Sequence, residues 1–142
     1  MDFFKVLIVD DHPNIRRILT DILGTLFPTM VIEEAADGRG AMEKIEDLPP
    51  NLIFMDIQMP GENGAELTRK IKAKYPQIAV IMLTSFDSPE IREAAYGNGA
   101  DHFIVKGRSS IDEILTFVES VLLGLGFDKY CNRLDLGMNR GP

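Results

Sequence analysis

Four short apolar runs, each ending in a reactive side chain, constrain this chain more than any other feature of its sequence. They cover residues 6–9, 52–55, 80–83 and 103–105, and they lead into Asp10 and Asp11, Asp56, Thr84 and Lys106, respectively. Short apolar runs separated by helix-like stretches are typical of strands in a parallel sheet that is covered on both faces. Because ligands bind at the carboxyl ends of such strands, the pattern predicts that three carboxylates, one hydroxyl and one ammonium meet at one edge of the sheet.

The segments between these runs change to the three- and four-residue spacing of amphipathic helices. Capping residues and prolines predict helix starts near Pro13, Asp37, Asn63, Ser88 and Ser110, and Gly124 predicts the end of the last helix. The apolar stripes of these helices, which include Ile18, Leu48 and Ile111, are expected to face the core. With a further strand over residues 30–36, strand and helix alternate five times, which predicts an α/β fold with a parallel sheet and right-handed crossovers.

Length and composition limit the classes of protein to consider. The 142 residues suffice for one domain, for which we expect the bounds 1–124, with residues 125–142 forming a tail or the start of a linker. A formal net charge of −7 disfavours nonspecific binding to nucleic acid or anionic lipid. The first apolar run is too short for a signal peptide or membrane span, so we expect a cytoplasmic protein, and the single cysteine, Cys131, leaves no internal disulfide.

The predicted acid cluster requires a positive partner. Two carboxylates ~5 Å apart repel by about 3 kcal/mol at an effective dielectric near 20, so the cluster is stable only with a bound cation or proton. Carboxylates of Asp11 and Asp56, a backbone carbonyl just past Asp56, which we assign to Gln58, and water would suit Mg²⁺ or another hard divalent cation. Asp10 is expected close by as an indirect, water-mediated partner. His12 is expected in a loop, with a structural or solvent-facing role in preference to metal ligation.

This arrangement is suited to phosphoryl transfer. Asp56 is the best candidate nucleophile because it stands alone after its apolar run, which leaves Asp10 and Asp11 for the cation. Lys106 can neutralise an oxygen of the transferred group as a point charge, and the Thr84 hydroxyl can donate a hydrogen bond to another.

The sequence resembles the receiver domain of two-component response regulators over residues 3–123. The resemblance is carried by Val-Asp-Asp-His at 9–12, Met-Asp-Ile-Gln-Met-Pro-Gly at 55–61, Leu-Thr-Ser at 83–85 and Phe-Ile-Val-Lys at 103–106. It implies a flavodoxin-like five-stranded sheet of order 2-1-3-4-5 and phosphoryl transfer to Asp56 from a histidine kinase or phosphotransfer protein, with Mg²⁺ bound. It also implies that Phe103 and Thr84 couple phosphorylation to a surface of the fourth helix, fifth strand and fifth helix.

The resemblance further implies a signalling switch, which promotes its own phosphorylation and dephosphorylation without being a turnover enzyme. A homodimer on phosphorylation is one expected readout, and no direct binding of nucleic acid or membrane is expected. Gly107 departs from the family, which commonly has a cis proline after the lysine. The segment Lys-Gly-Arg-Ser-Ser at 106–110 is similar to receivers with helix-turn-helix outputs, so a stand-alone receiver and a part of a longer regulator both remain open.

Three other classes stay under consideration. A haloacid-dehalogenase-like phosphatase needs a second carboxylate two residues after its nucleophile, and position 12, two residues after Asp10, is histidine. A nucleotide or flavin binder needs a glycine- or hydroxyl-rich loop after the first strand, where this chain has acids. An interaction module that is never phosphorylated would not need the intact acid cluster.

Overall fold

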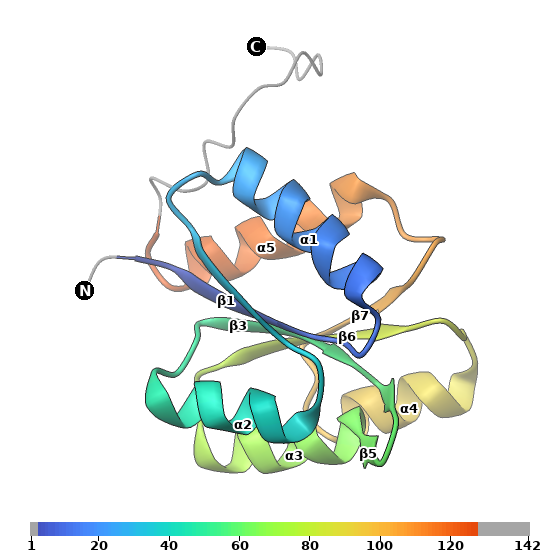
Figure 1. Ribbon diagram of the computed structural model, residues 1–142. Coiled ribbons are helices and arrows are strands. Elements are labelled where there is room, and N and C mark those ends of the chain that lie inside the picture. Colours follow the sequence, from blue (N-terminus) through green and yellow to red (C-terminus); the bar gives the residue numbers. More distant parts are fainter. Residues whose placement is uncertain (1–2, 128–142) are drawn as a thin grey trace.

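A five-stranded parallel sheet forms the centre of the protein. The computed structural model describes residues 3–127, and Figure 1 shows the sheet between two layers of helices. The strands are β1 (Lys5–Val9), β2 (Val31–Ala35), β3 (Leu52–Asp56), β6 (Ala79–Thr84) and β7 (His102–Val105), in the order β2-β1-β3-β6-β7 with every pairing parallel. The predicted flavodoxin-like fold and its strand order 2-1-3-4-5 are confirmed.

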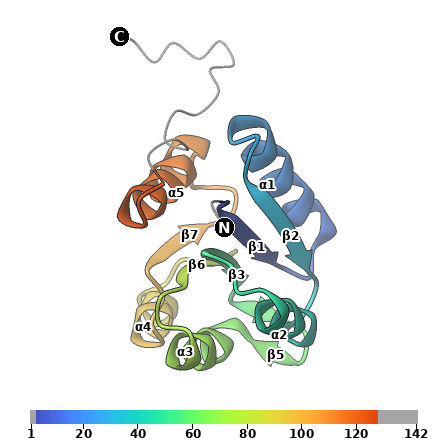
Figure 2. The same cartoon turned by 90° about the vertical axis from the view of Figure 1, so that its left-hand side faces the viewer.

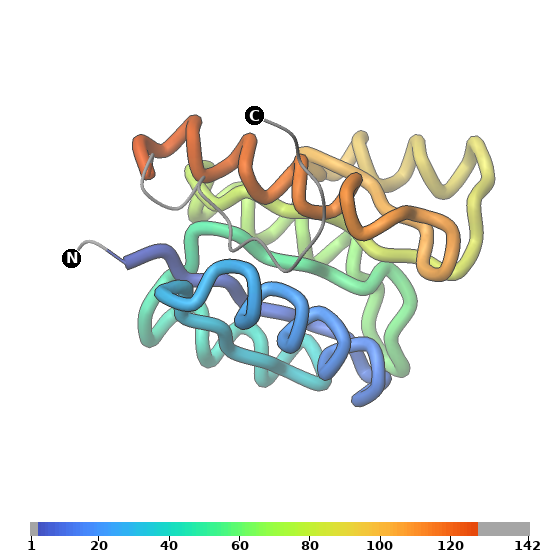
Figure 3. Tube along the Cα trace, turned by 90° about the horizontal axis from the view of Figure 1, so that it is seen from above, coloured from blue at the N-terminus to red at the C-terminus, as the bar shows by residue number. Residues whose placement is uncertain are grey.

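The helices cover both faces of the sheet. Helices α1 (Pro13–Leu26) and α5 (Ile111–Gly124) lie on one face, where they sit beside each other (Figures 2 and 3), and α2 (Gly38–Asp47), α3 (Gly64–Lys74) and α4 (Pro89–Gly97) lie on the other. Alternate residues of one strand therefore enter different cores: Leu52 and Phe54 belong to the core under α1 and α5, while Ile53 and Met55 belong to the opposite core. This double burial explains why the strands read as continuous apolar runs.

Side-chain caps begin four of the helices where the sequence predicted them. Asp37, Asn63, Ser88 and Ser110 each accept a hydrogen bond from a backbone N–H of the first helical turn. Helix α5 ends at Gly124 as expected, but the glycine with a positive φ is Gly126, at 83°. Gly126 N–H donates to Leu123 O and Phe127 N–H to Leu122 O, which is the bonding of a Schellman motif.

Two short strands were not predicted. Strands β4 (Gln58–Met59) and β5 (Glu62–Asn63) form a small antiparallel pair in the connection between β3 and α3. Elements of two residues have no periodicity that a sequence could reveal. Gly64, the first residue of α3, comes so close to this connection that a Cβ there would overlap the backbone carbonyl of Asp56, and this contact fixes α3 against the end of β3.

Three large residues of the apolar stripes, and the small Ala94 of α4, are exposed, contrary to prediction. Ile18, Leu48 and Ile111 are 53%, 46% and 49% exposed. Leu48 is the C-cap of α2, and Ile18 and Ile111 line a hollow between α1 and α5. The predicted helical spacing was correct, but all three residues lie at the margin of the core. Within the described residues, no helix is long and apolar enough to cross a membrane, and Cys131 lies outside them.

Candidate functional site

The register of the sheet gathers the predicted site residues at its carboxyl edge. Val9 pairs with Met55 and Asp56 pairs with Leu83, so Asp10, Asp56 and Thr84 follow or end neighbouring strands at nearly the same level. Lys106 follows β7, and its N–H donates to the carbonyl of Thr84 at 2.7 Å. Four segments that are far apart in the sequence therefore deliver their polar ends to one place.

Lys106 joins two of the carboxylates directly. Its Nζ lies 2.6 Å from Asp10 Oδ2 and 3.3 Å from Asp56 Oδ1. The lysine side chain is 11% exposed, and the two aspartates are almost fully buried. Since ion pairs are screened little when buried, this ammonium is the main internal counter-charge of the acid cluster.

Asp56 remains incompletely neutralised even so. Its Oδ1 also accepts a hydrogen bond from Gln58 N–H at 3.2 Å, whereas Oδ2 is a buried oxygen with no hydrogen-bond partner. Burial, and then the charge of Asp10, raise the pKa of Asp56 to about 7, against the lowering effects of Lys106 and the Gln58 N–H. Near neutral pH, this carboxyl therefore exchanges its proton readily for another positive partner.

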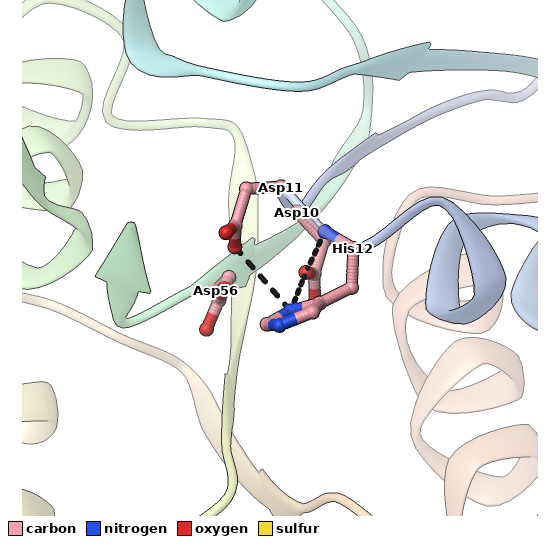
Figure 4. Close-up of side chains that lie close together, drawn as sticks. All are labelled: Asp10, Asp11, His12 and Asp56. Atoms are coloured by element: carbon pink, nitrogen blue, oxygen red, sulfur yellow. Dashed lines mark hydrogen bonds and ion pairs between the residues drawn. The ribbon is translucent and has the colours of Figure 1, made fainter. Parts of the chain in front are cut away.

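Asp11 and His12 complete the rim of the cluster, as Figure 4 shows. His12 Nδ1 lies 3.1 Å from Asp10 Oδ1 and 3.4 Å from Asp11 Oδ1, and the His12 backbone N–H donates to Asp10 Oδ1 at 2.9 Å. His12 is the N-cap of α1 without a capping side chain, and its ring is 63% exposed. The predicted loop position of His12 is confirmed, with the ring turned toward the acids.

Thr84 and Phe103 lie on the side of the site nearest α4. The fully buried Thr84 hydroxyl accepts a hydrogen bond from Phe86 N–H at 3.1 Å. Phe103 is 5% exposed, with its ring centroid 6.4 Å from that of Tyr96 and 4.9 Å from the Arg92 guanidinium carbon. In this structure Phe103 is thus turned inward, and side chains of α4 cover it.

Three residues that support the site were not predicted. Arg16 Nη1 donates to the carbonyl of Asp10 at 2.6 Å, and Ser109 Oγ accepts from Val105 N–H at 3.1 Å beside Lys106. Arg92, which covers Phe103, also forms a two-point pair with Asp87, and this hydrogen bonding holds the pKa of Asp87 below its usual range. These contacts depend on tertiary structure, so they could not be predicted from helical spacing or from the positions where strands end.

The turn after Lys106 shows how the chain accommodates glycine instead of proline. No peptide bond among residues 3–127 is cis, and Gly107 has a φ of 80°. A positive φ is favourable for glycine but strained for other residues, so Gly107 supplies the turn by its backbone conformation.

The donor set fits a divalent cation. Asp11 Oδ1 and Asp56 Oδ2 are buried oxygens without a hydrogen-bond partner, and such atoms are costly unless a proton or cation meets them. Asp10, Asp11, His12 and Asp56 each offer a ligand atom, all within 4.8 Å of one another. Three ionised carboxylates and the Lys106 ammonium leave a local charge of −2, which a divalent cation balances.

Comparison with known proteins identifies the class to which this site belongs. The family model of the response regulator receiver domain matches residues 6–119. The response regulator protein VraR of Staphylococcus epidermidis is 41% identical over 108 residues, which cover 76% of this chain and 52% of VraR. The chain thus spans about half the length of the curated relatives it matches.

Solved structures agree with this assignment. A DNA-binding response regulator of the LuxR family from Staphylococcus aureus has a TM-score of 0.74 and 30% identity, covering 83% of this chain and 98% of its own. The response regulator TrrA from Thermotoga maritima, in complex with Mg²⁺ and BeF, has a TM-score of 0.73 and 30% identity, covering 84% and 99%. The chain belongs to the response regulator receiver family of two-component signalling systems, which confirms the resemblance seen in the sequence.

Proposed function

We propose that this receiver accepts a phosphoryl group on Asp56 from a histidine kinase or phosphotransfer protein, with Mg²⁺ or another divalent cation, and thereby switches an interaction surface. The observation that carries the proposal is the setting of Asp56, a buried carboxyl with one oxygen 3.3 Å from Lys106 and the other without a partner. We assign the receiver unit to residues 1–124 and give residues 125–142 the role of a tail or the start of a linker.

The two oxygens of Asp56 then have different roles. Oδ1 attacks the phosphorus in line, the new O–P bond forms, and the bond to the kinase histidine breaks with its electron pair returning to the imidazole. Lys106 is within reach of Oδ1 and neutralises the phosphoryl oxygens, while the Thr84 hydroxyl donates to another of them once it turns toward the group.

Cation binding follows from the remaining donors. Asp11 Oδ1, Asp56 Oδ2 and the backbone carbonyl of Gln58 would be the direct ligands, and Asp10 would act indirectly because its two oxygens already face Lys106 and His12. When bound, the cation neutralises charge on the transferred group. The same residues would hold the ion before and after phosphorylation, because none of their ligand atoms is consumed.

Mass spectrometry tests the assignment of Asp56. After incubation with acetyl phosphate and Mg²⁺, the wild type should carry one phosphoryl group and Asp56→Asn none. Asp21→Asn, which alters an exposed aspartate of α1, is the matched control and should be modified like the wild type. An undiminished adduct in Asp56→Asn would falsify the proposal.

Phosphorylation alone should shift only part of the population to the active conformation of the surface formed by α4, β7 and α5. One net hydrogen bond from Thr84 is worth about 0.5 to 1.5 kcal/mol and a charge-assisted one from Lys106 about 1.5 to 3 kcal/mol. Their sum of roughly 2 to 4.5 kcal/mol is less than the ~5.5 kcal/mol that drives an equilibrium from 1:99 to 99:1. A partner selective for the active state supplies the rest, and a second copy of the chain is one such partner.

Sedimentation with and without beryllofluoride, a phosphoryl mimic, tests this switch. The mimic should increase self-association of the wild type, and Thr84→Ala should bind it with a weaker response. Equal responses of the two proteins would show that Thr84 is not the coupling residue. If neither protein associates, the readout is a different target and not a dimer.

A further inference from the structure

We propose that His12 is a direct ligand in the cation site and makes it prefer ions such as Mn²⁺, Co²⁺ and Zn²⁺ over Mg²⁺. The proposal rests on the proposed function only in that both place the ion among the same carboxylates. It departs from the expectation that His12 has a structural or solvent-facing role, because the ring proves to face the acids (Figure 4).

The spacing of the donor atoms is that of neighbouring ligands on one ion. Metal–ligand bonds of ~2.1 Å put adjacent ligands about 3.0 Å apart in octahedral and about 3.4 Å apart in tetrahedral geometry. His12 Nδ1 lies 3.4 Å from Oδ1 of Asp11, one of the direct carboxylate ligands, while its 3.1 Å contact with Asp10 Oδ1 is a hydrogen-bond distance to the indirect partner. The nitrogen therefore already occupies a position next to the carboxylates that an additional ligand would take.

Unsatisfied buried oxygens point independently to an ion at this position. Asp56 is 2% exposed, and its Oδ2 has no hydrogen-bond partner. Asp11 Oδ1, the neighbour of the His12 nitrogen, is likewise buried without a hydrogen bond. Ligand atoms of these residues lie within 4.8 Å of one another, so a side-chain adjustment of roughly half an ångström brings opposite ligands to the ~4.2 Å span of an octahedral ion.

His12 is free to make this adjustment. Its ring is 63% exposed, so it can rotate without disturbing the core. Asp10 need not move, because its Oδ2 stays with Lys106 while its Oδ1 keeps the backbone N–H of His12. The resulting direct donors are one imidazole nitrogen, the carboxylates of Asp11 and Asp56, and the backbone carbonyl of Gln58.

Donor chemistry then decides which ions are favoured. Mg²⁺ prefers oxygen ligands and retains its water, so it gains little from an imidazole. Zn²⁺ and Co²⁺ accept imidazole readily and Mn²⁺ less readily, and the affinities of mixed nitrogen and oxygen sites rise from Mn²⁺ to Co²⁺. Removing His12 should therefore weaken the binding of these ions and leave that of Mg²⁺ nearly unchanged.

Metal binding by purified variants tests the proposal. Cys131→Ser is the common background, because it removes the only thiol of the chain. His12→Asn retains a residue favoured at helix N-caps, and His102→Asn is the matched control because His102, at the start of β7, is the only other histidine. Co²⁺ and Mg²⁺ affinities are measured by calorimetry, and bound Mn²⁺ is examined by pulsed electron paramagnetic resonance for coupling to an imidazole nitrogen.

The background protein and His102→Asn should show the nitrogen coupling, and His12→Asn should lose it. Loss of the ligand should weaken Co²⁺ binding at least about tenfold while Mg²⁺ affinity changes less than about threefold. Absence of nitrogen coupling in the background protein, or equal Co²⁺ affinities, would overturn the proposal. Asp56 phosphorylation with Mg²⁺, measured on the same proteins, reports separately on the proposed function.

Discussion

The buried carboxyl of Asp56 should make the folded protein less stable as pH rises, and Asp56→Asn should remove this cost. The pKa of Asp56 is about 7 in the folded protein, mainly because of burial, against 3.8 for the free side chain. Between these values the folded state binds more protons than the unfolded state, so the free energy of unfolding falls as pH rises. The contribution is fully unfavourable above about pH 7 and disappears below about pH 4.

The size of this effect follows from the shift. A difference of about three pKa units corresponds to an upper bound of about 4 kcal/mol. Relaxation and water penetration reduce such penalties, so we expect Asp56→Asn to be more stable than the wild type by about 1 to 3 kcal/mol at pH 8. The linkage relation predicts that the gap shrinks by more than half at pH 5.

Urea unfolding at pH 5 and pH 8, with a chelator present, measures this difference. The slope against urea should be the same for both proteins, because neither the fold nor the exposed surface changes. Asp21→Asn is the control for removing an exposed charge and should stay near the wild type at both pH values. An Asp56→Asn protein that is no more stable at pH 8, or whose advantage is the same at pH 5, would refute the reasoning.

Three further predictions concern cation binding, backbone packing and DNA. Asp11→Ala should weaken Mg²⁺ binding at least about tenfold by calorimetry, and an affinity equal to that of Asp21→Ala would count against Asp11 as a ligand. Gly64→Ala should lower the free energy of unfolding by about 1 to 3 kcal/mol, because its Cβ would overlap the carbonyl of Asp56. Gly124→Ala, where a Cβ meets open space, should be neutral or stabilising in the same urea titration, and equal effects would contradict the packing argument. Because the net charge is −7, gel shifts with this chain alone should show no salt-resistant, sequence-specific DNA complex.

The fold was predictable because its strands obey a simple rule. Strands β1, β3 and β6 are buried on both faces, so they contain the continuous apolar runs 6–9, 52–55 and 80–83. Strand β2 is half exposed at the sheet edge, and it lies within residues 30–36, which were predicted as a strand. The exposure of apolar side chains at the margins of the core was not predictable, as Ile18 shows. Helical spacing gives the direction in which a side chain points, but it does not tell whether side chains of other elements cover it.

Sequence alone predicted which residues lie together at this edge of the sheet, but it did not predict the contacts between them. Asp10, Asp56 and Lys106 meet because parallel strands end at one edge of the sheet, which sequence alone indicates. Lys106 Nζ lies 2.6 Å from Asp10 Oδ2 and 3.3 Å from Asp56 Oδ1. These distances depend on the geometry of the turn after β7. That geometry involves Ser109 and Gly107. The raised pKa of Asp56, by contrast, follows mainly from burial and from the charge of Asp10.

The incomplete neutralisation of Asp56 links stability to ligand binding. Lys106 has one positive charge for two buried carboxylates and lies closer to Asp10, so Asp56 is left to a proton near neutral pH. A cation that replaces this proton recovers the energy lost on ionisation, because it binds the folded state and not the unfolded chain. Mg²⁺ should therefore stabilise the wild type more than Asp56→Asn, and more at pH 8 than at pH 5. The same residual charge that costs stability thus favours uptake of the positive partner that the proposed phosphoryl transfer requires.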